Sequence, residues 1–191
     1  RQYIGDGSFT ETFAPTAGLL SLRLALTMAV NLGLKPYQLD VEQAFLNNKL
    51  DTDIVMELPK GVNIEGHNHV YLQKGVYGLK QAPAIWYKQC KETILSVAPE
   101  LSCAVSDPCF FHYFGEDRII IMTICVDDFA IFTNDENWIN NFEQKFNKIY
   151  TINREPDFEW FLGIRLTWNQ DKTAVRLDQP NDLHKALTFY N

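Results

Sequence analysis

The sequence has no apolar run long enough to span a membrane. Its longest apolar stretch, residues 19–32, is interrupted by Arg23 and by Ser, Thr and Asn residues, and it is shorter than the roughly 20 residues that a membrane helix needs. Residues 1–7 also lack the positive region and the apolar region of a signal peptide. These two absences favour an intracellular protein.

The sequence also lacks any C-x-x-C pair, so its cysteines indicate neither a zinc ribbon nor a redox motif. Their spacing predicts buried free thiols in a reducing compartment. The four cysteines are Cys90, Cys103, Cys109 and Cys125.

The sequence also has no excess of basic over acidic residues. The chain carries 17 Lys and Arg against 24 Asp and Glu, a net charge of −7, whereas a protein that neutralises phosphates needs Lys and Arg. One segment departs from this balance, because residues 71–94 hold four lysines, four Tyr or Trp residues and a single acid, Glu92. Such a segment suits a nucleic-acid strand. The alternative is a lysine-bearing helix face that is merely solvated.

What the chain does have is the composition of a folded core. Hydrophobic residues make up 46% of its 191 residues, with 13 Phe, 8 Tyr and 4 Trp. A chain of this length can bury about 70% of its unfolded surface. We expect one core, or one core with an appended lobe, and no repeat or low-complexity linker marks an internal boundary.

Local patterns predict the elements of an α+β fold. Residues 21–32 are apolar nearly all round and predict a buried helix, with Ser21 as its N-cap and Gly33 as its stop. Alternation over residues 37–41 predicts a strand that carries Asp40 and Glu42 on its polar face.

The rest of the chain continues in the same style, and its order predicts an antiparallel sheet with helices packed on one face. A β-hairpin formed by residues 118–125 and 129–133 is expected to carry Asp127 and Asp128 at its tip. The remaining expected elements are strands at 53–57 and 70–72, a helix after Pro83, an amphipathic helix marked by Trp138, Phe142, Phe146 and Ile149, and a second hairpin in which residues 158–168 and 173–177 flank the turn 169–172.

Adjacent carboxylates at a hairpin tip are costly unless a positive group offsets their repulsion. Mg²⁺ prefers hard oxygen ligands and is held by a few carboxylates plus substrate phosphates, so Asp40, Asp127 and Asp128 are candidate ligands. By pattern alone, the alternative for an Asp-Asp pair is a solvated turn.

The segments around these acids resemble the polymerase motifs of copia-type reverse transcriptases. Any one of them is a weak match, but six in family order cover essentially the whole chain. They are residues 11–15 (ETFAP), 40–47 (DVEQAFLN), 76–83 (VYGLKQAP), 106–110 (SDPCF), 126–128 (VDD) and 161–164 (FLGI).

The resemblance implies an RNA-directed and DNA-directed DNA polymerase of right-hand architecture, with residues 1–191 forming fingers and palm. The first fingers strands would precede Arg1, and thumb and RNase H would follow Asn191. Asp40, Asp127 and Asp128 match the catalytic aspartates that hold two Mg²⁺ ions, or Mn²⁺, and the carbonyl of Val41 would join them.

Further roles follow from the same resemblance. Phe45 and Gln81 would line the nucleotide pocket, Phe45 lying under the incoming sugar, although an ordinary core Phe is an equal alternative. Template and primer contacts fall on two groups of residues, which are Lys80, Lys88 and Lys91 for the template, and Cys125, Phe161, Leu162 and Gly163 for the primer.

Two departures from the family pattern concern the site. Cys125 stands where retroelements most often have Tyr, which changes contacts with the primer end. Residues 152–156 (INREP) stand where the family commonly reads Met-Lys-Asp-Leu-Gly, so a cation from this turn would have to come from Arg154.

The resemblance also implies partners and a location. The expected partners are a template-primer and a deoxynucleoside triphosphate, together with further segments of a retroelement polyprotein or a second copy of this chain. No membrane is expected among them. The location is a cytoplasmic virus-like particle or the nucleus. Two alternatives remain, namely a domesticated domain that binds nucleic acid or a protein without catalysis, and a structural module that assembles with other chains.

Overall fold

The computed structural model describes residues 12–190, within which the side chains of residues 51, 182, 184, 186 and 190 are not described. The expectations for residues 1–7 and for Glu11 therefore lie outside the described residues.

The chain divides into two compact units. Unit 1 comprises Arg1–Pro15 and Gln43–Thr93, and unit 2 comprises Thr16–Glu42 and Ile94–Asn191. Each unit thus consists of two separate segments, and the segments of the two units alternate along the chain. Composition did not reveal these boundaries, because no repeat or low-complexity linker marks them.

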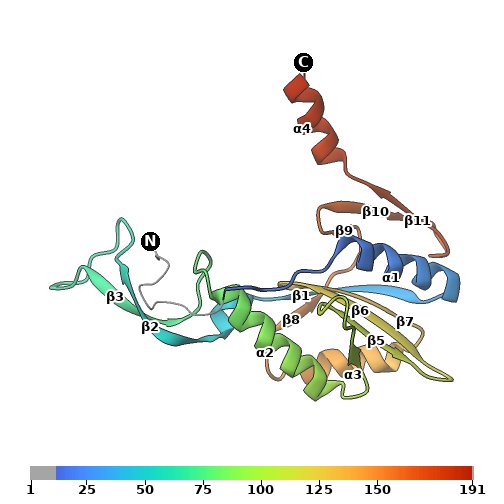
Figure 1. The fold of residues 1–191 in the computed structure, drawn as a ribbon, viewed down its shortest axis with the longest axis horizontal. Helices are drawn as coiled ribbons and strands as arrows, with labels where there is room; N and C mark the ends of the chain where they lie inside the picture. The colour runs from blue at the N-terminus through green and yellow to red at the C-terminus, as the bar shows by residue number, and fades with distance from the viewer. Residues whose placement is uncertain (1–11, 191) are drawn as a thin grey trace. The chain divides into compact units, whose positions relative to one another are not determined.

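Unit 2 is built on a six-stranded sheet in which every neighbouring pair is antiparallel (Figure 1). Three of its four interior strands are the expected hairpin and the expected Asp40 strand, whereas the fourth, β5, was not expected. β-branched and aromatic residues are frequent in the hairpin. In spatial order the strands are β4 (Ser102–Cys103), β5 (Phe110–Phe114), β6 (Ile119–Cys125), β7 (Asp128–Thr133), β1 (Lys35–Val41) and β8 (Ile152–Arg154).

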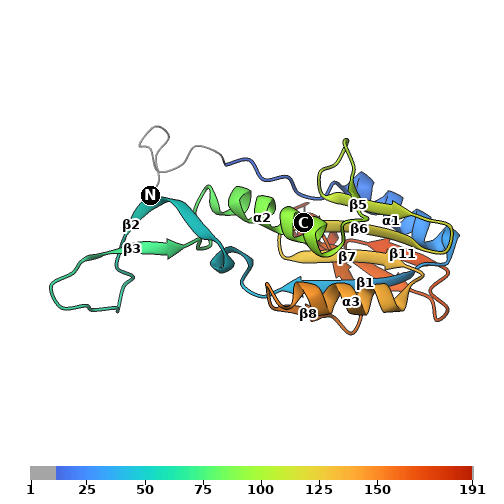
Figure 2. The same cartoon turned by 90° about the horizontal axis from the view of Figure 1, so that it is seen from below.

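Helices cover both faces of this sheet, so the expectation of helices on one face is wrong. Ala130 and Phe132 of β7 share a core with helix α1 (Leu19–Leu32), which packs on β6 and β7. Phe129 points to the opposite face and meets Phe146 of helix α3 (Glu136–Phe146) with ring centroids 5.5 Å apart. Figure 2 shows the sheet from the α3 side. Both faces of β7 are apolar, and this feature requires two covering layers.

Helix α1 is buried on one face only, contrary to expectation. Leu22 and Leu26 are in the core, whereas Leu20 and Leu24 are 79% and 53% exposed. The helix begins two residues before Ser21, with Gly18 as N-cap. It ends as expected at Gly33, which adopts the left-handed conformation (φ 65°) that glycine tolerates best.

The first turn of α1 is capped by a residue far away in the sequence. Asp107 accepts hydrogen bonds from the backbone N–H of Gly18 (3.1 Å) and from the hydroxyl of Ser21, and its other oxygen accepts from the N–H of Cys109 (2.9 Å). One carboxylate therefore ties the helix to the loop before β5.

The expected second hairpin is a three-stranded sheet with the order β11-β10-β9. Its strands are β9 (Trp160–Phe161), β10 (Ile164–Trp168) and β11 (Val175–Asp178). Leu162 and Gly163 separate the first two, with φ of 53° and 73°, as in a type I′ turn. The apolar run over residues 158–168 concealed this turn. Helix α4 (Pro180–Tyr190) follows.

The amphipathic helix was expected to include Ile149. Helix α3 ends at Phe146, and Ile149 is 53% exposed. The N-cap of α3 is Asp135, whose carboxylate accepts from the N–H of Trp138 (2.9 Å).

Unit 1 contains the two expected strands as an antiparallel pair, β2 (Lys49–Glu57) and β3 (His69–Lys74). The 3₁₀ helix η1 (Ala44–Asn47) precedes them. Helix α2 (Ala82–Val97) begins in unit 1 and ends in unit 2, and Trp86, Cys90 and Ile94 on its apolar face are buried as expected.

The structure also shows the helices and the cysteines about which the sequence raised expectations. No described helix has the length and apolar content to cross a bilayer. All four cysteines are free, and two of them, Cys90 and Cys109, are buried, whereas the other two are half-buried.

Candidate active site

The three candidate catalytic acids converge at one end of the central sheet in unit 2. Asp40 is the penultimate residue of β1, and Asp128 is the first residue of β7. The two are direct cross-strand partners, a relation that places their Cα atoms about 4.5–5.5 Å apart. Asp127 lies in the two-residue turn between β6 and β7.

The backbone holds this turn against β1. The carbonyl of Asp127 accepts a hydrogen bond from the N–H of Val41 (2.9 Å). Val126 has a positive φ of 58°, which is costly for a β-branched residue and is maintained only where surrounding structure imposes it. The tip that carries Asp127 is therefore hydrogen-bonded to β1.

Burial and mutual repulsion raise the pKa of two of these carboxyls. Burial is the largest cause for Asp128, with Asp127, Asp40 and Glu155 adding repulsion, while a hydrogen bond from Gln38 acts in the opposite direction. Burial also raises the pKa of Asp40, with Asp127, Glu155 and Glu42 contributing repulsion. A cation at this position would relieve both effects.

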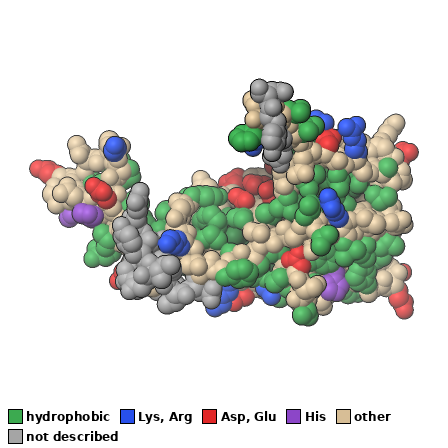
Figure 3. Space-filling model, turned by 45° about the horizontal axis from the view of Figure 1, so that its top comes forward, with side chains coloured by type: hydrophobic (Ala, Val, Ile, Leu, Met, Phe, Trp, Pro, Cys, Tyr) green, Lys and Arg blue, Asp and Glu red, His purple; other side chains and the backbone are tan. Residues whose placement is uncertain are grey.

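Asp40 and Asp128 line a pocket of about 390 Å³ within unit 2. Residues from the segment 155–160 also line it, including Glu155, Asp157 and Trp160, so the segment that leads into β9 lies beside the carboxylates. None of the described lining residues is Lys or Arg. Acidic side chains gather in one region of the face drawn in Figure 3, whereas Lys and Arg are scattered over it.

Glu155 and Gln38 belong to this pocket but were not expected there. Glu155 lies beside Gln38 because its N–H donates a hydrogen bond to the carbonyl of Gln38 (2.9 Å). This bond extends the β1–β8 ladder by one residue. No local sequence pattern predicts that β1 and β8, separated by 110 residues, will pair. For Gln38, the signal was its place on the same strand face as Asp40.

The donor set fits Mg²⁺ in its chemistry, since hard carboxylate oxygens are the ligands this ion prefers. Among the described residues, no three His, Cys, Asp or Glu side chains converge closely enough to hold a metal. Like-charged side chains separate unless a cation draws them together, and Asp40, Asp127 and Asp128 are the groups that would hold one.

Arg154 does not supply the cation that the sequence suggested for this turn. Its guanidinium is ion-paired with Glu143 of α3 (2.6 Å), donates to Asn140 (2.8 Å) and lies 5.1 Å from the ring centroid of Tyr37. Tyr37 alternates with Gln38 along β1 and so faces away from the carboxylates.

Cys125 directly opposes Asp128 across the β6–β7 hairpin. Burial, followed by repulsion from Asp128 and Asp127, raises the pKa of its thiol to about 11. The position expected to meet the primer end therefore presents a neutral thiol at physiological pH.

Unit 1 brings together the two residues expected at the nucleotide. Phe45 of η1 is 7% exposed, and its ring centroid lies 4.6 Å from that of Tyr77. Gln81 is buried and starts α2, since its carbonyl accepts from the N–H of Ile85 (3.0 Å). Gly75 lies between these segments, because a Cβ there would be 2.7 Å from the carbonyl oxygen of Phe45 and 3.4 Å from the Cβ of Ala82.

The expected template lysines lie on or just before α2. Lys80 and Lys88 are exposed. Lys91 is half-buried, with its ammonium 5.9 Å from the ring centroid of Tyr87. Their solvent-facing position is compatible with either a phosphate contact or a solvated face.

The hairpin expected to hold the primer has a buried base. Phe161 is 2% exposed and belongs to the core shared with α1, whereas the turn residues Leu162 and Gly163 reverse the chain. Phe161 therefore packs as an ordinary core residue, Leu162 packs partly against the same core, and Gly163 is the exposed residue of the turn.

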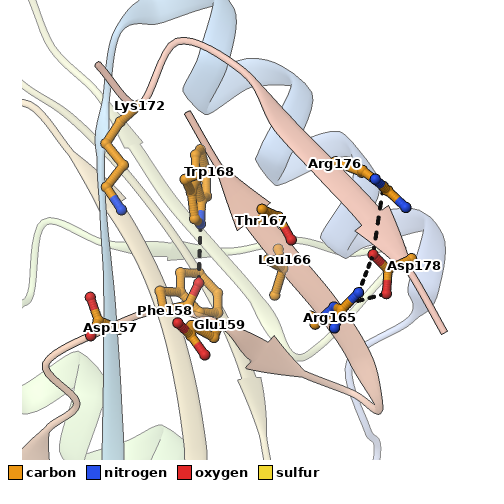
Figure 4. A pocket seen from close by; sticks show the side chains of 10 residues that line it. All are labelled: Asp157, Phe158, Glu159, Arg165, Leu166, Thr167, Trp168, Lys172, Arg176 and Asp178. Atoms are coloured by element: carbon orange, nitrogen blue, oxygen red, sulfur yellow. Dashed lines mark hydrogen bonds and ion pairs between the residues drawn. The ribbon is translucent and has the colours of Figure 1, made fainter. Parts of the chain in front are cut away.

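A second pocket of about 600 Å³ lies on this three-stranded sheet (Figure 4). Arg165 and Arg176 both pair with Asp178, at 3.0 and 3.6 Å. Trp168 donates from its indole to the carbonyl of Phe158 (3.1 Å). The two arginines of this pocket are thus paired with Asp178, and the ammonium of Lys172 lies 5.8 Å from the ring centroid of Trp168.

The whole chain, residues 1–191, matches the family described as reverse transcriptase (RNA-dependent DNA polymerase). It is 32% identical over 186 residues to the retrovirus-related Pol polyprotein from transposon TNT 1-94 of Nicotiana tabacum. The matched region covers 96% of this chain and 14% of that protein. It is 33% identical over 158 residues to the Pol polyprotein from transposon RE1 of Arabidopsis thaliana, covering 82% of this chain and 11% of the relative.

A more distant relative is the transposon Ty1-H Gag-Pol polyprotein of Saccharomyces cerevisiae, 23% identical over 200 residues, with 98% of this chain and 11% of the relative covered. The chain thus spans between 11% and 14% of the length of these relatives. It belongs to the reverse transcriptase (RNA-dependent DNA polymerase) family, and to the copia type within it.

Proposed function

We propose that this chain carries the nucleotidyl-transfer site of a retrotransposon reverse transcriptase. The reaction is an in-line attack of a primer 3′-hydroxyl on the α-phosphate of a deoxynucleoside triphosphate, with pyrophosphate leaving. Unit 2, which holds the three acids, corresponds to the palm, and unit 1 to the fingers. The natural setting is the polyprotein of a retroelement, in a cytoplasmic virus-like particle or the nucleus.

One observation supports this proposal above the others. Asp40 and Asp128, 88 residues apart in the sequence, are cross-strand partners, and the intervening turn with Asp127 is hydrogen-bonded to Val41. Three carboxylates held at one sheet end are the donor set that a pair of Mg²⁺ ions requires. When bound, such ions activate the attacking hydroxyl and neutralise the leaving oxygens.

The chain's own residues then have positioning roles. Asp40, Asp127 and Asp128 would hold the ions that bind the reacting phosphate, and the carbonyl of Val41 would be a further ligand. The β9–β10 turn at Leu162 and Gly163, whose leading segment lines the same pocket, holds the primer end close to the three acids.

The other contacts are proposed within each unit. In unit 1, Phe45 and Gln81 line the nucleotide site and Lys80, Lys88 and Lys91 contact template phosphates. In unit 2, Cys125 adjoins the primer terminus.

The test is primer extension with Mg²⁺ or Mn²⁺ by the natural protein that contains this chain. Asp40→Asn and Asp127→Asn keep side-chain volume but remove metal-binding charge, so each should abolish extension while leaving the fold intact. Asp117→Asn is the matched control, because Asp117 is exposed in the loop at the other end of β6. It should extend like the wild type.

Wild-type extension by either site variant would refute the catalytic assignment. A wild-type protein that binds a template-primer but never extends it would favour the domesticated, binding-only alternative.

A further inference from the structure

Gln38 is a buried polar residue that no proposed step yet uses. It is 9% exposed and lies on β1 two residues before Asp40, so both side chains project from the same face of the strand. Its side-chain amide donates a hydrogen bond to Oδ1 of Asp128, at 3.3 Å.

The backbone on both sides of Gln38 is fixed. β1 is an interior strand between β7 and β8. Gln38 opposes Ala130 of β7, and its carbonyl accepts from the N–H of Glu155 at 2.9 Å. The amide therefore reaches Asp128 diagonally, from a strand whose backbone is held on both sides.

The Asp128 carboxylate needs such an anchor. It stands opposite Asp40 and next to Asp127, so repulsion favours rotation of its carboxylate away from the other two acids. A donor fixed on one oxygen opposes that rotation.

We propose that Gln38 is a positioning residue for Asp128. By holding Oδ1, it leaves Oδ2 as the oxygen available to a cation and keeps the carboxylate oriented before metal and substrates arrive. This inference rests on the proposed function, because it assigns Asp128 as a metal ligand. Gln38 itself touches neither metal nor substrate.

The alternative is that Gln38 merely satisfies a buried amide. Gln38→Met separates the two possibilities, since it keeps length and removes both the donor and the polar group. Removing one partner of a buried hydrogen bond leaves the other unsatisfied and lowers stability, so a purely structural amide predicts a lower melting temperature with unchanged Mn²⁺ affinity.

The experiment measures Mn²⁺ binding by calorimetry without substrates, together with primer extension by the natural protein. For Gln38→Met we expect a modest fall in the metal-free melting temperature, because the Asp128 carboxylate loses its donor. The Mn²⁺ dissociation constant should rise by about tenfold or more, the usual effect of removing a partner that orients a metal ligand. At fixed Mg²⁺, kcat should fall similarly, while KM for the nucleotide stays within about twofold.

Gln38→Asn is the second variant, used also if Gln38→Met does not fold. Its amide is one methylene too short to span the distance, so it should show the same loss while remaining polar. Gln144→Met, an exposed position on α3, is the matched control and should change none of these values.

Unchanged Mn²⁺ binding and kcat in folded Gln38→Met or Gln38→Asn would overturn the inference. That result would leave the proposed function unaffected as long as Asp40→Asn and Asp127→Asn still abolish Mn²⁺ binding and primer extension. If those two variants bind Mn²⁺ and extend primers like the wild type, the proposed function fails first.

Discussion

Asp128 is a carboxyl whose ionisation opposes folding in the absence of metal. Burial and the charges of Asp127 and Asp40 raise its pKa above the usual 3.8. The folded protein therefore keeps this proton to a higher pH than the unfolded chain, so the contribution of Asp128 to stability falls as pH rises above about 3.8. Below that pH the neutral carboxyl carries no such penalty.

Asp128→Asn should consequently stabilise the metal-free protein by an amount that grows with pH. We expect no difference in melting temperature from the wild type near pH 3.5, and a higher melting temperature for the variant at pH 7, by about 2–4 °C for each kcal/mol of repulsion relieved. Thermal denaturation in a chelator, across a pH series, measures this difference. A large loss of stability in Asp128→Asn would instead mark the acid as structural.

Phe45 has both a packing contact and a proposed steric role. Its ring is nearly buried against Tyr77, so Phe45→Ala should cost about 3–5 kcal/mol of unfolding free energy. If the ring also lies under the incoming sugar, Phe45→Val should raise kcat/KM for ribonucleotides relative to deoxynucleotides. The ratio is the decisive measurement, because a general folding loss cancels from it.

Tyr77→Ala is the control for Phe45. It removes the same ring contact from the other side, and so should lower stability without changing the ratio. A ratio equal to that of the wild type in a folded Phe45→Val protein would leave Phe45 as a core residue only.

At the scale of single elements, helix α1 depends on Asp107. That carboxylate accepts from Gly18 and Ser21 at the start of the helix and from Cys109 in its own loop. Asp107→Ala should reduce the free energy of unfolding by about 1–2 kcal/mol, the usual cost of a lost N-cap, as measured by urea denaturation. Asp117→Ala, at an exposed loop position, should change it by less than about 0.5 kcal/mol.

Helix α2 is the element whose lysines are expected to meet the template. Because Lys is a point charge without base readout, Lys88→Ala should weaken binding equally on different template sequences. It should also reduce the magnitude of the log–log salt slope by about 0.7–0.9. Lys148→Ala, another exposed position, is the control. A salt slope that does not change in Lys88→Ala would identify a solvated face.

Across the whole molecule, stability should be distributed unevenly between the two units. The interior strands β6 and β7 are buried along almost their entire length and are covered on both faces, whereas β2 and β3 form a sheet of only two strands. An isolated pair of strands is marginally stable. We expect amides of β6 and β7 to exchange at least about a hundredfold more slowly than those of β2 and β3, a difference of roughly 3 kcal/mol in opening free energy.

Hydrogen exchange followed by mass spectrometry gives this comparison directly. Equal protection of the two hairpins would show that both units open together in a single cooperative transition, contrary to the division seen in the structure.

The sequence by itself determined the local elements and the identity of the three acids. The strand of Asp40, the hairpin of Asp127 and Asp128, and the stop at Gly33 depend on periodicity and turn chemistry within a few residues. The six family segments then assigned the chain to the reverse transcriptases, because a set of short motifs in fixed order needs no knowledge of how they pack.

Only the tertiary structure decided which residues surround those acids. Gln38 contacts Asp128 because β1 pairs with β7. Glu155 lines the pocket of Asp40 and Asp128 because β1 also pairs with β8. The capping of α1 by Asp107 is of the same kind. The covering of both sheet faces also depends on packing, since an apolar run cannot tell one buried face from two. Each of these relations joins segments tens of residues apart, and the register that joins them depends on the burial of a whole core rather than on any local pattern.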